Sequence, residues 1–99
     1  MKLSTYNLSN FKYIPQIKKL RNEQVEAIEV VGNVLPFKVN NYVIHELIDW
    51  DNIDNDAMFK LTFPQKGMLN KNHYGLMWNT LVGSANKDVI KTTANKIRL

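Results

Sequence analysis

The stretch that decides the fold reads Asn22-Glu23-Gln24-Val25-Glu26-Ala27-Ile28-Glu29-Val30-Val31-Gly32. Val25, Ile28 and Val31 recur at helical spacing on one side of it, and the three glutamates fall on the other side. The glutamates also suit the positive end of a helix dipole, and the Gly32-Asn33 pair is a stop signal. We therefore predict an amphipathic helix over residues 22–32, with Asn22 as its N-cap.

Similar periodicity recurs on both sides of this stretch. Upstream, Pro15 can start a short helix that runs to Leu20. Downstream we expect three more helices, one opening at Asn40 or Asn41, one capped by Asn70 or Asn72 and ended by Gly83-Ser84, and one capped by Asn86. Their predicted apolar faces are, in chain order, Val43, Ile44, Leu47, Ile48 and Trp50; Tyr74, Met77, Trp78, Leu81 and Val82; and Val89, Ile90, Thr93, Ala94 and Ile97.

The segments between these helices are shorter and carry weaker signals. Residues 51–55 read as a turn, because their side chains readily bond their own backbone. Residues 57–63 could form one or two helical turns or a brief strand, and residues 64–67 a loop. We predict an all-α fold in which residues 1–99 form one domain of four to five short amphipathic helices, with little or no strand.

Composition sets the outer limits on function. The chain has 99 residues, of which 44% are hydrophobic and 22% charged, and these are ordinary globular values. It contains no cysteine, which excludes a disulfide scaffold, a thiolate zinc site, iron–sulfur ligands and a cysteine nucleophile. No apolar run is long enough to span a membrane, and the first residues lack the apolar core of a secretion signal. We expect a cytoplasmic protein.

The net charge of +4 hides three blocks of alternating sign. Residues 1–22 sum to +5, residues 23–56 to −7 and residues 57–99 to +6, which together give +4. Nucleic-acid binders usually gather their cations into one stripe, whereas here an acidic block separates two basic ones. We expect the blocks to neutralise one another within the fold, with nucleic-acid binding as the minor alternative.

The most polar feature is the acidic segment, residues 49–56, which carries Asp49, Asp51, Asp54 and Asp56. It is not an EF-hand, because counting from Asp49 places Ile53 at the fifth position and Lys60 at the twelfth. A weaker divalent-cation or catalytic-carboxylate site is the sharper alternative. Such clusters are more often a solvated helix end and turn, which is the interpretation we favour.

The remaining candidate groups lack the partners that chemistry needs. His45 and His73 have no ligand at metal-binding spacing, and a surface pair between His45 and Asp49 is the expected arrangement. The glycines form no phosphate-binding motif, and Ser4, Ser9 and Ser84 lie in no nucleophile elbow. Trp50 and Trp78 are expected to be core or interface anchors rather than base-stacking platforms. A helix-turn-helix is disfavoured because the connector after Gly32 is long and the flanking helices are acidic. We assign no catalytic, cofactor-binding or metal-ligating residue.

One long ungapped pattern does point to a family. It consists of Leu35-Pro36-Phe37, a Tyr42-x-x-x-x-Leu47-Ile48 helix, the acidic segment, and an apolar piece that ends in Pro64 and reaches Leu69. This pattern resembles the N-terminal region of lysine 2,3-aminomutase-like (KamA-type) radical S-adenosylmethionine proteins. The segments 11–17 and 92–99 look similar as well, so the resemblance covers nearly the whole chain. Ala57 is a departure, since these proteins usually place Pro there, and we expect the change to loosen the start of the next segment.

The resemblance implies a role without chemistry for these residues. In the family, a C-x-x-x-C-x-x-C motif on a partial barrel holds a 4Fe–4S cluster with S-adenosylmethionine, and aminomutases add a lysine that binds pyridoxal phosphate. None of these residues can be carried onto this chain, which has no cysteine.

We therefore expect a non-catalytic N-terminal helical domain, either a fragment or a naturally short relative, that is not an enzyme on its own. Its expected partners are the barrel of the parent protein or a sister subunit in a homo-oligomer. The alternative is an independent helical module that binds another protein through its acidic middle or its basic ends.

Overall fold

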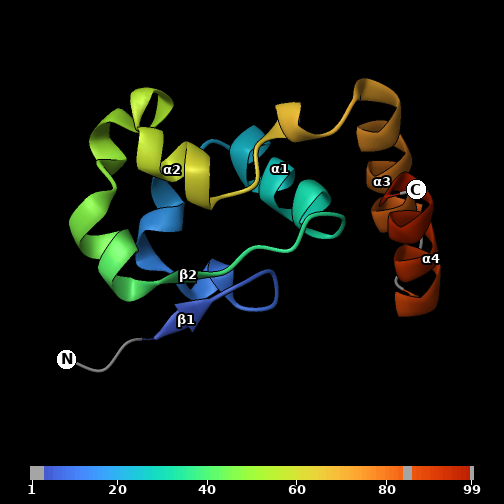
Figure 1. Cartoon of the computed structure of the whole chain (residues 1–99), viewed down its shortest axis with the longest axis horizontal. Helices are drawn as coiled ribbons and strands as arrows, with labels where there is room; N and C mark the ends of the chain where they lie inside the picture. Colours follow the sequence, from blue (N-terminus) through green and yellow to red (C-terminus); the bar gives the residue numbers. More distant parts are fainter. Residues whose placement is uncertain (1–3, 84–85, 99) are drawn as a thin grey trace.

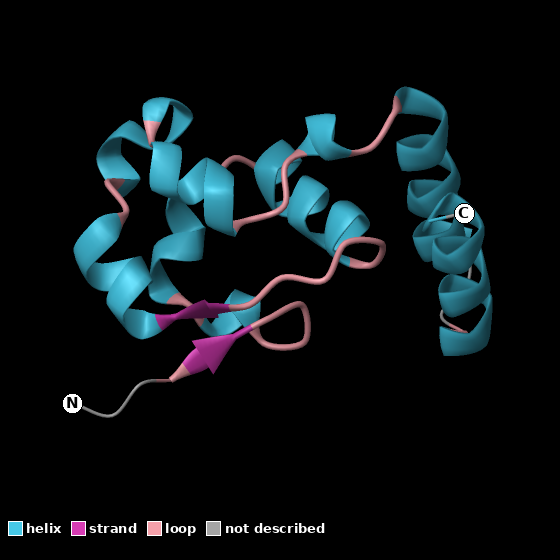
Figure 2. Ribbon diagram, in the orientation of Figure 1, coloured by secondary structure: helices cyan, strands magenta, loops and turns pink. Residues whose placement is uncertain are grey.

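The computed structural model describes residues 4–83 and 86–98, and most of them are helical, which confirms the all-α prediction. Figure 2 shows short helices joined by loops, with two short strands near the N-terminus. The elements, with η marking a short 3₁₀ or π helix, are β1 (Thr5–Tyr6), η1 (Phe11–Tyr13), η2 (Pro15–Lys19), α1 (Asn22–Gly32), β2 (Val39–Asn40), η3 (Val43–Leu47), η4 (Trp50–Asn55), α2 (Ala57–Thr62), η5 (Lys66–Met68), α3 (Lys71–Gly83) and α4 (Lys87–Arg98). No helix within the described residues is long and apolar enough to cross a membrane.

Helix α1 lies at the centre of the molecule, between the short helices on one side and α3 and α4 on the other (Figure 1). It buries Ile28 in one cluster of apolar side chains and Ala27, Val30 and Val31 in a second cluster. We call the first cluster the N-terminal core; its buried members are Phe11, Ile14, Ile17, Leu20, Ile28, Val39, Ile44, Ile48, Ile53, Phe59 and Phe63. We call the second cluster the C-terminal core; its buried members are Ala27, Val30, Val31, Val34, Tyr74, Met77, Ala94 and Ile97.

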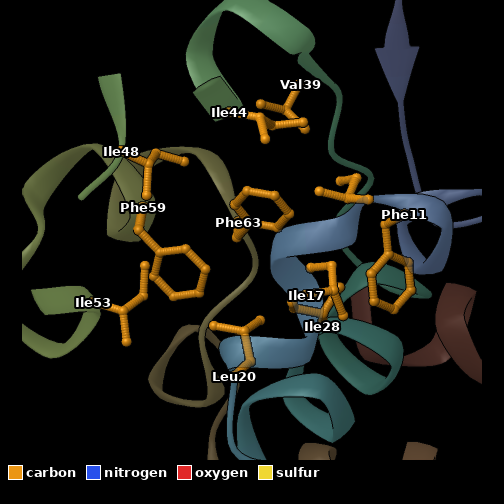
Figure 3. Close-up of a cluster of buried hydrophobic side chains, with 11 residues drawn as sticks. Phe11, Ile17, Leu20, Ile28, Val39, Ile44, Ile48, Ile53, Phe59 and Phe63 are labelled. Carbon is orange, nitrogen blue, oxygen red and sulfur yellow. The ribbon is translucent and has the colours of Figure 1, made fainter. Parts of the chain in front are cut away.

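Aromatic rings organise the N-terminal core. Figure 3 shows Phe59 and Phe63 reaching into this core from the α2 region, and their rings stack with centroids 5.1 Å apart. Trp50 meets both rings edge-on, at 5.9 and 6.0 Å, and its Nε1 donates a hydrogen bond to the carbonyl oxygen of Ile44 at 2.8 Å. Trp50 is therefore an anchor of the core, as predicted, and its polar atom is satisfied.

Local capping signals in the sequence identify several helix starts correctly. Asn70 Oδ1 accepts a hydrogen bond from the amide of His73 at 2.8 Å at the start of α3, and Asn86 Oδ1 accepts one from the amide of Asp88 at 2.8 Å at the start of α4. Pro15 occupies the first turn of η2. Helix α1 instead has Arg21 at its N-cap, where Gln24 Oε1 accepts the Arg21 amide, and Asn22 is its first helical residue. Helix α3 ends at Gly83 as predicted, while Ser84 lies outside the described residues.

Residues 39–56 differ most from the sequence prediction. Val39–Asn40 pairs antiparallel with Thr5–Tyr6, and Asn40 Oδ1 then accepts the amide of Val43 at 2.9 Å. The helix that follows is a widened π turn and stops at Leu47, so Leu47 is 41% exposed, whereas Ile48 is buried from an extended backbone. Residues 50–55 form 3₁₀ turns rather than an open turn.

Two further differences concern the second half of the chain. The ambiguous segment after residue 56 is helical, as α2. The predicted apolar faces of α3 and α4 are too wide, since Trp78, Val82 and Val89 are 39%, 67% and 44% exposed. Tyr74, Met77, Thr93, Ala94 and Ile97 are the buried residues of those faces, because the neighbouring helices cover only one sector of each helix.

Replacing Phe59 by Leu should lower the free energy of unfolding by about 1–3 kcal/mol, because the ring stack is lost and part of a fully buried side chain disappears. The matched control is Leu61→Ala on the same helix, where the side chain is 79% exposed and the change should stay within about 0.5 kcal/mol. Urea unfolding followed by circular dichroism measures both variants. Equal effects would contradict the assignment of Phe59 to the core.

Replacing Ala57 by Pro should raise the free energy of unfolding by about 0.4–1 kcal/mol. Ala57 is the first residue of α2, where Pro has the right φ and its missing amide hydrogen costs nothing. The preceding residue, Asp56, has φ −85° and ψ 113°, which is compatible with a following Pro. Thermal unfolding of Ala57→Pro against Met58→Pro, which lies one residue further into the helix, tests this. A loss of stability in Ala57→Pro would place the start of α2 elsewhere.

Candidate functional site

The acidic segment is held by bonds within the fold. Asp49 Oδ1 accepts the amide of Asp51 at 3.1 Å, and the two oxygens of Asp56 accept the amides of Asp49 at 2.9 Å and Phe59 at 2.7 Å. These backbone amides lower the pKa of Asp56 below its ordinary value. Asp49 and Asp56 therefore act as caps for η4 and α2, in agreement with the interpretation as a helix end and turn.

The other two carboxylates of the segment are in ion pairs with the start of the chain. Asp51 pairs with Lys19 at 2.9 Å, and Asp54 pairs with Arg21 Nη1 at 2.9 Å. Each cation lowers the pKa of the carboxyl group that it contacts. For both Asp51 and Asp54 the hydrogen bond from the cation is the largest cause, and for Asp51 the positive charge of Lys19 is the second. Within residues 4–83 and 86–98, no group of three or more histidine, aspartate or glutamate side chains is placed to hold a metal ion.

The histidines differ from the prediction in one respect. His45 Nδ1 lies 2.9 Å from Gln16 Nε2, and the expected pair with Asp49 is not formed. The reason is that the helix ends at Leu47, so Asp49 no longer lies one helical turn from His45 and caps η4 instead. His73 sits in the first turn of α3, where its ring nitrogen lies 3.2 Å from Asn70 Nδ2.

A cleft of about 250 Å³ lies beside the N-terminal end of α1. Its floor includes Ile53 and Phe59, and Arg21, Lys60 and Lys66 stand among its charged lining residues. Arg21 is fixed there by two carboxylates, Asp54 and Glu23, and these bonds raise its pKa. The described lining includes no histidine or hydroxyl side chain, and its charged groups are carboxylates, lysines and Arg21.

The charge blocks are only partly neutralised. The four ion pairs found among the described residues each join a cation of residues 12–21 to a carboxylate of residues 23–54. This confirms the expected complementarity of the first two blocks. The cations of the third block form no ion pair within the described part of the chain, and among them Lys66 lies over the Tyr74 ring at 5.2 Å.

The third block lies largely on the hairpin, our name for α3 and α4, which pack side by side (Figure 1). The hairpin also carries exposed apolar side chains, of which Trp78 and Val82 lie one turn apart on α3. Exposed apolar and unpaired cationic groups together make the hairpin the strongest candidate for a functional surface in the described chain.

Two polar contacts that join the hairpin to α1 were missed by the sequence analysis. The Tyr74 hydroxyl donates to Glu26 Oε1 at 2.8 Å, and burial, with that carboxylate, raises the pKa of Tyr74. Arg98 Nε donates to the carbonyl oxygen of Val34 at 2.6 Å, and Nη2 to that of Asn33 at 3.4 Å. A tyrosine on a buried face does signal the need for a polar partner, but the partner lies too far along the chain to be identified from the sequence.

Comparison with known proteins adds no relative: no family model, curated protein or solved structure matches the chain.

The cap made by Asp56 should be visible as a pH-dependent contribution to stability. Asp56→Ala should lower the free energy of unfolding at pH 7 by about 0.5–2 kcal/mol, because the backbone amides of Asp49 and Phe59 lose their acceptor. Since the folded pKa of Asp56 lies below its ordinary value near 3.8, the carboxylate stabilises the fold above that value and this contribution is lost as the pH falls through the folded pKa.

Urea unfolding of wild type and Asp56→Ala at a series of pH values measures this difference. It should be largest at neutral pH and shrink as the pH falls below about 4. Asp51→Ala is the control, since it removes only a solvent-exposed ion pair with Lys19 and should cost less at pH 7. A pH-independent difference for Asp56→Ala would contradict the capping role.

Proposed function

We propose that residues 1–99 are the non-catalytic N-terminal helical region of a lysine 2,3-aminomutase-like radical S-adenosylmethionine protein. Their role is to pack against the rest of that protein or against a sister subunit. Part of the pattern that carries the resemblance packs in the core, which supports this. The Phe37 ring centroid lies 5.7 Å from that of Phe63 and 6.1 Å from that of Phe11, and Ile48 is buried in the same core. Leu35, Tyr42 and Leu47 of the same pattern are 40%, 48% and 41% exposed, so they are accessible to another surface.

The position of Ala57 supports the same proposal. The family usually has Pro at this point, and the first residue of a capped helix is the place where Pro is best tolerated. The backbone here is thus suited to the residue that the relatives carry, although this chain has Ala.

In this proposal the chain supplies no ligand to the cofactors of the family. A 4Fe–4S cluster of the C-x-x-x-C-x-x-C type needs three thiolates, and the chain has no cysteine, so its residues do not fit that group. The contribution of these residues is positioning and assembly, and any reaction would belong to the complete protein.

The observation that carries the packing role is the apolar surface of the hairpin. Trp78 and Val82 are exposed on a helix that packs against α1 and α4 through other residues, so they are available to another surface. The barrel of the parent protein or a second copy of the chain would bury them, and the isolated chain is therefore expected to self-associate.

The coding sequence offers the most direct test. If the native reading frame continues past the codon for Leu99 and encodes C-x-x-x-C-x-x-C further along, the proposal is supported. A stop codon at that point would leave a short protein without the chemistry and would favour the alternative, an independent interaction module.

Self-association of the 99-residue chain should be weakened by polar substitution on the hairpin. Val82→Ser should raise the dissociation constant of the oligomer about tenfold, since an exposed branched side chain that becomes buried contributes on the order of 1–2 kcal/mol. Light scattering coupled to size-exclusion chromatography, over a concentration series, measures it. Leu61→Ser, an exposed position on α2, is the control and should leave the constant unchanged. A wild-type chain that stays monomeric throughout would count against this surface.

A further inference from the structure

A groove of about 560 Å³ runs between α4 and the C-terminal end of α1. Its described lining consists of Asn33, Lys87, Ile90, Lys91, Ala94 and Arg98. Ile90 and Ala94 lie one turn apart on α4 and are the apolar residues of this lining. Ala94 is small and only 2% exposed, so the accessible apolar surface comes mainly from the partly exposed Ile90. Helix α4 therefore provides the apolar surface that the groove offers to a ligand.

Three cations stand along this apolar surface. Lys87, Lys91 and Arg98 are four and seven residues apart on α4, so they follow one side of the helix over about 16 Å. Arg98 is fixed by the carbonyl oxygens of Val34 and Asn33 and by Asn95 Oδ1 at 3.2 Å. These three partners of the Arg98 guanidinium are all neutral oxygens.

The two lysines supply free positive charge. Neither Lys87 nor Lys91 forms an ion pair within residues 4–83 and 86–98, and the described lining of the groove has no carboxylate. The carboxylates of the acidic segment are held elsewhere, as caps or by the cations of residues 19–21. The charge of the groove is thus left for a ligand from outside the described chain.

We propose that this groove binds an acidic, amphipathic peptide segment of another protein. Two carboxylates at helical i, i+4 spacing match Lys87 and Lys91, and an aliphatic side chain between them packs against Ile90, which lies between the two lysines. The described lining of the groove comes from α4 and from Asn33, which follows α1, so the proposal does not depend on the domain role given above.

A peptide fits these features better than a nucleic acid does. Single-stranded nucleic acid is held by aromatic stacking together with a track of cations, and the lining of the groove has no aromatic side chain. A small anion such as phosphate would gain nothing from the apolar surface. Only a ligand that combines negative charge with apolar side chains uses both parts of the site.

The proposal is tested with the 99-residue chain and a fluorescent helical peptide of about 12 residues, a length that spans the stripe of cations. The peptide carries Glu at i and i+4 with Leu between them; a second peptide has Gln in place of Glu. We expect the Glu peptide to bind at least about tenfold more tightly than the Gln peptide, as measured by fluorescence anisotropy at physiological salt.

Paired variants separate the groove from general attraction by charge. Lys87→Gln with Lys91→Gln should weaken binding of the Glu peptide by about 3- to 30-fold. The matched control, Lys71→Gln with Lys96→Gln, removes the same charge from hairpin positions outside the groove and should change binding less than about twofold. Thermal unfolding confirms that both variants fold.

Three outcomes would overturn the proposal. The first is no binding of the Glu peptide at millimolar concentration. The second is equal weakening in the two double variants, which would mean attraction by net charge alone. The third is tighter binding of a single-stranded oligonucleotide of similar length, with an affinity that falls steeply with salt, which would assign the hairpin to nucleic acid.

Discussion

The fold depends on one helix that is buried from two sides. Helix α1 packs Ile28 into the N-terminal core and Val30 and Val31 into the C-terminal core, and all three side chains are at most 1% exposed. A chain of 99 residues has little apolar surface to bury, and neither core would be large on its own. Sharing α1 makes the two cores support each other. It also fixes the position of the hairpin, because Tyr74 and Arg98 bond to groups on α1 or just after it.

The sequence predicts those parts of the fold that depend on local interactions. The period of apolar residues identifies α1, and the amide-to-side-chain bonds of Asn70 and Asn86 span only two or three residues, so capping patterns find the starts of α3 and α4. The pairing of Thr5–Tyr6 with Val39–Asn40 has no local signal, because it is formed between distant segments. The burial of individual side chains is hard to predict for a similar reason. Periodicity shows that Val82 lies on an apolar face, but it does not show that no other element covers this side chain among the described residues.

The same division applies to the candidate site. The spacing of the acidic segment excluded only an EF-hand, and its interpretation as a helix end and turn rested on the usual role of such clusters. The capping bonds of Asp56 are local. Its ionic partners, Lys19 and Arg21, come from the other side of α1 in the sequence, and only the folded chain brings them together. The groove could not be predicted from the sequence for the same reason, because Asn33 and Lys91 are brought together only by tertiary packing.

Charge is distributed unevenly between the two ends of the fold. The four carboxylates of the acidic segment are engaged within it: Asp49 and Asp56 cap helices, while Asp51 and Asp54 pair with cations from the start of the chain. Using any of these carboxylates as a metal ligand or a catalytic group would remove a helix cap or an ion pair from the fold. The lysines of the hairpin form no ion pair within the described chain. Pairing with an acidic surface would therefore break no ion pair of the fold. Free cations beside exposed apolar side chains are what a docking surface requires, and here both lie on the helices farthest from the N-terminal core.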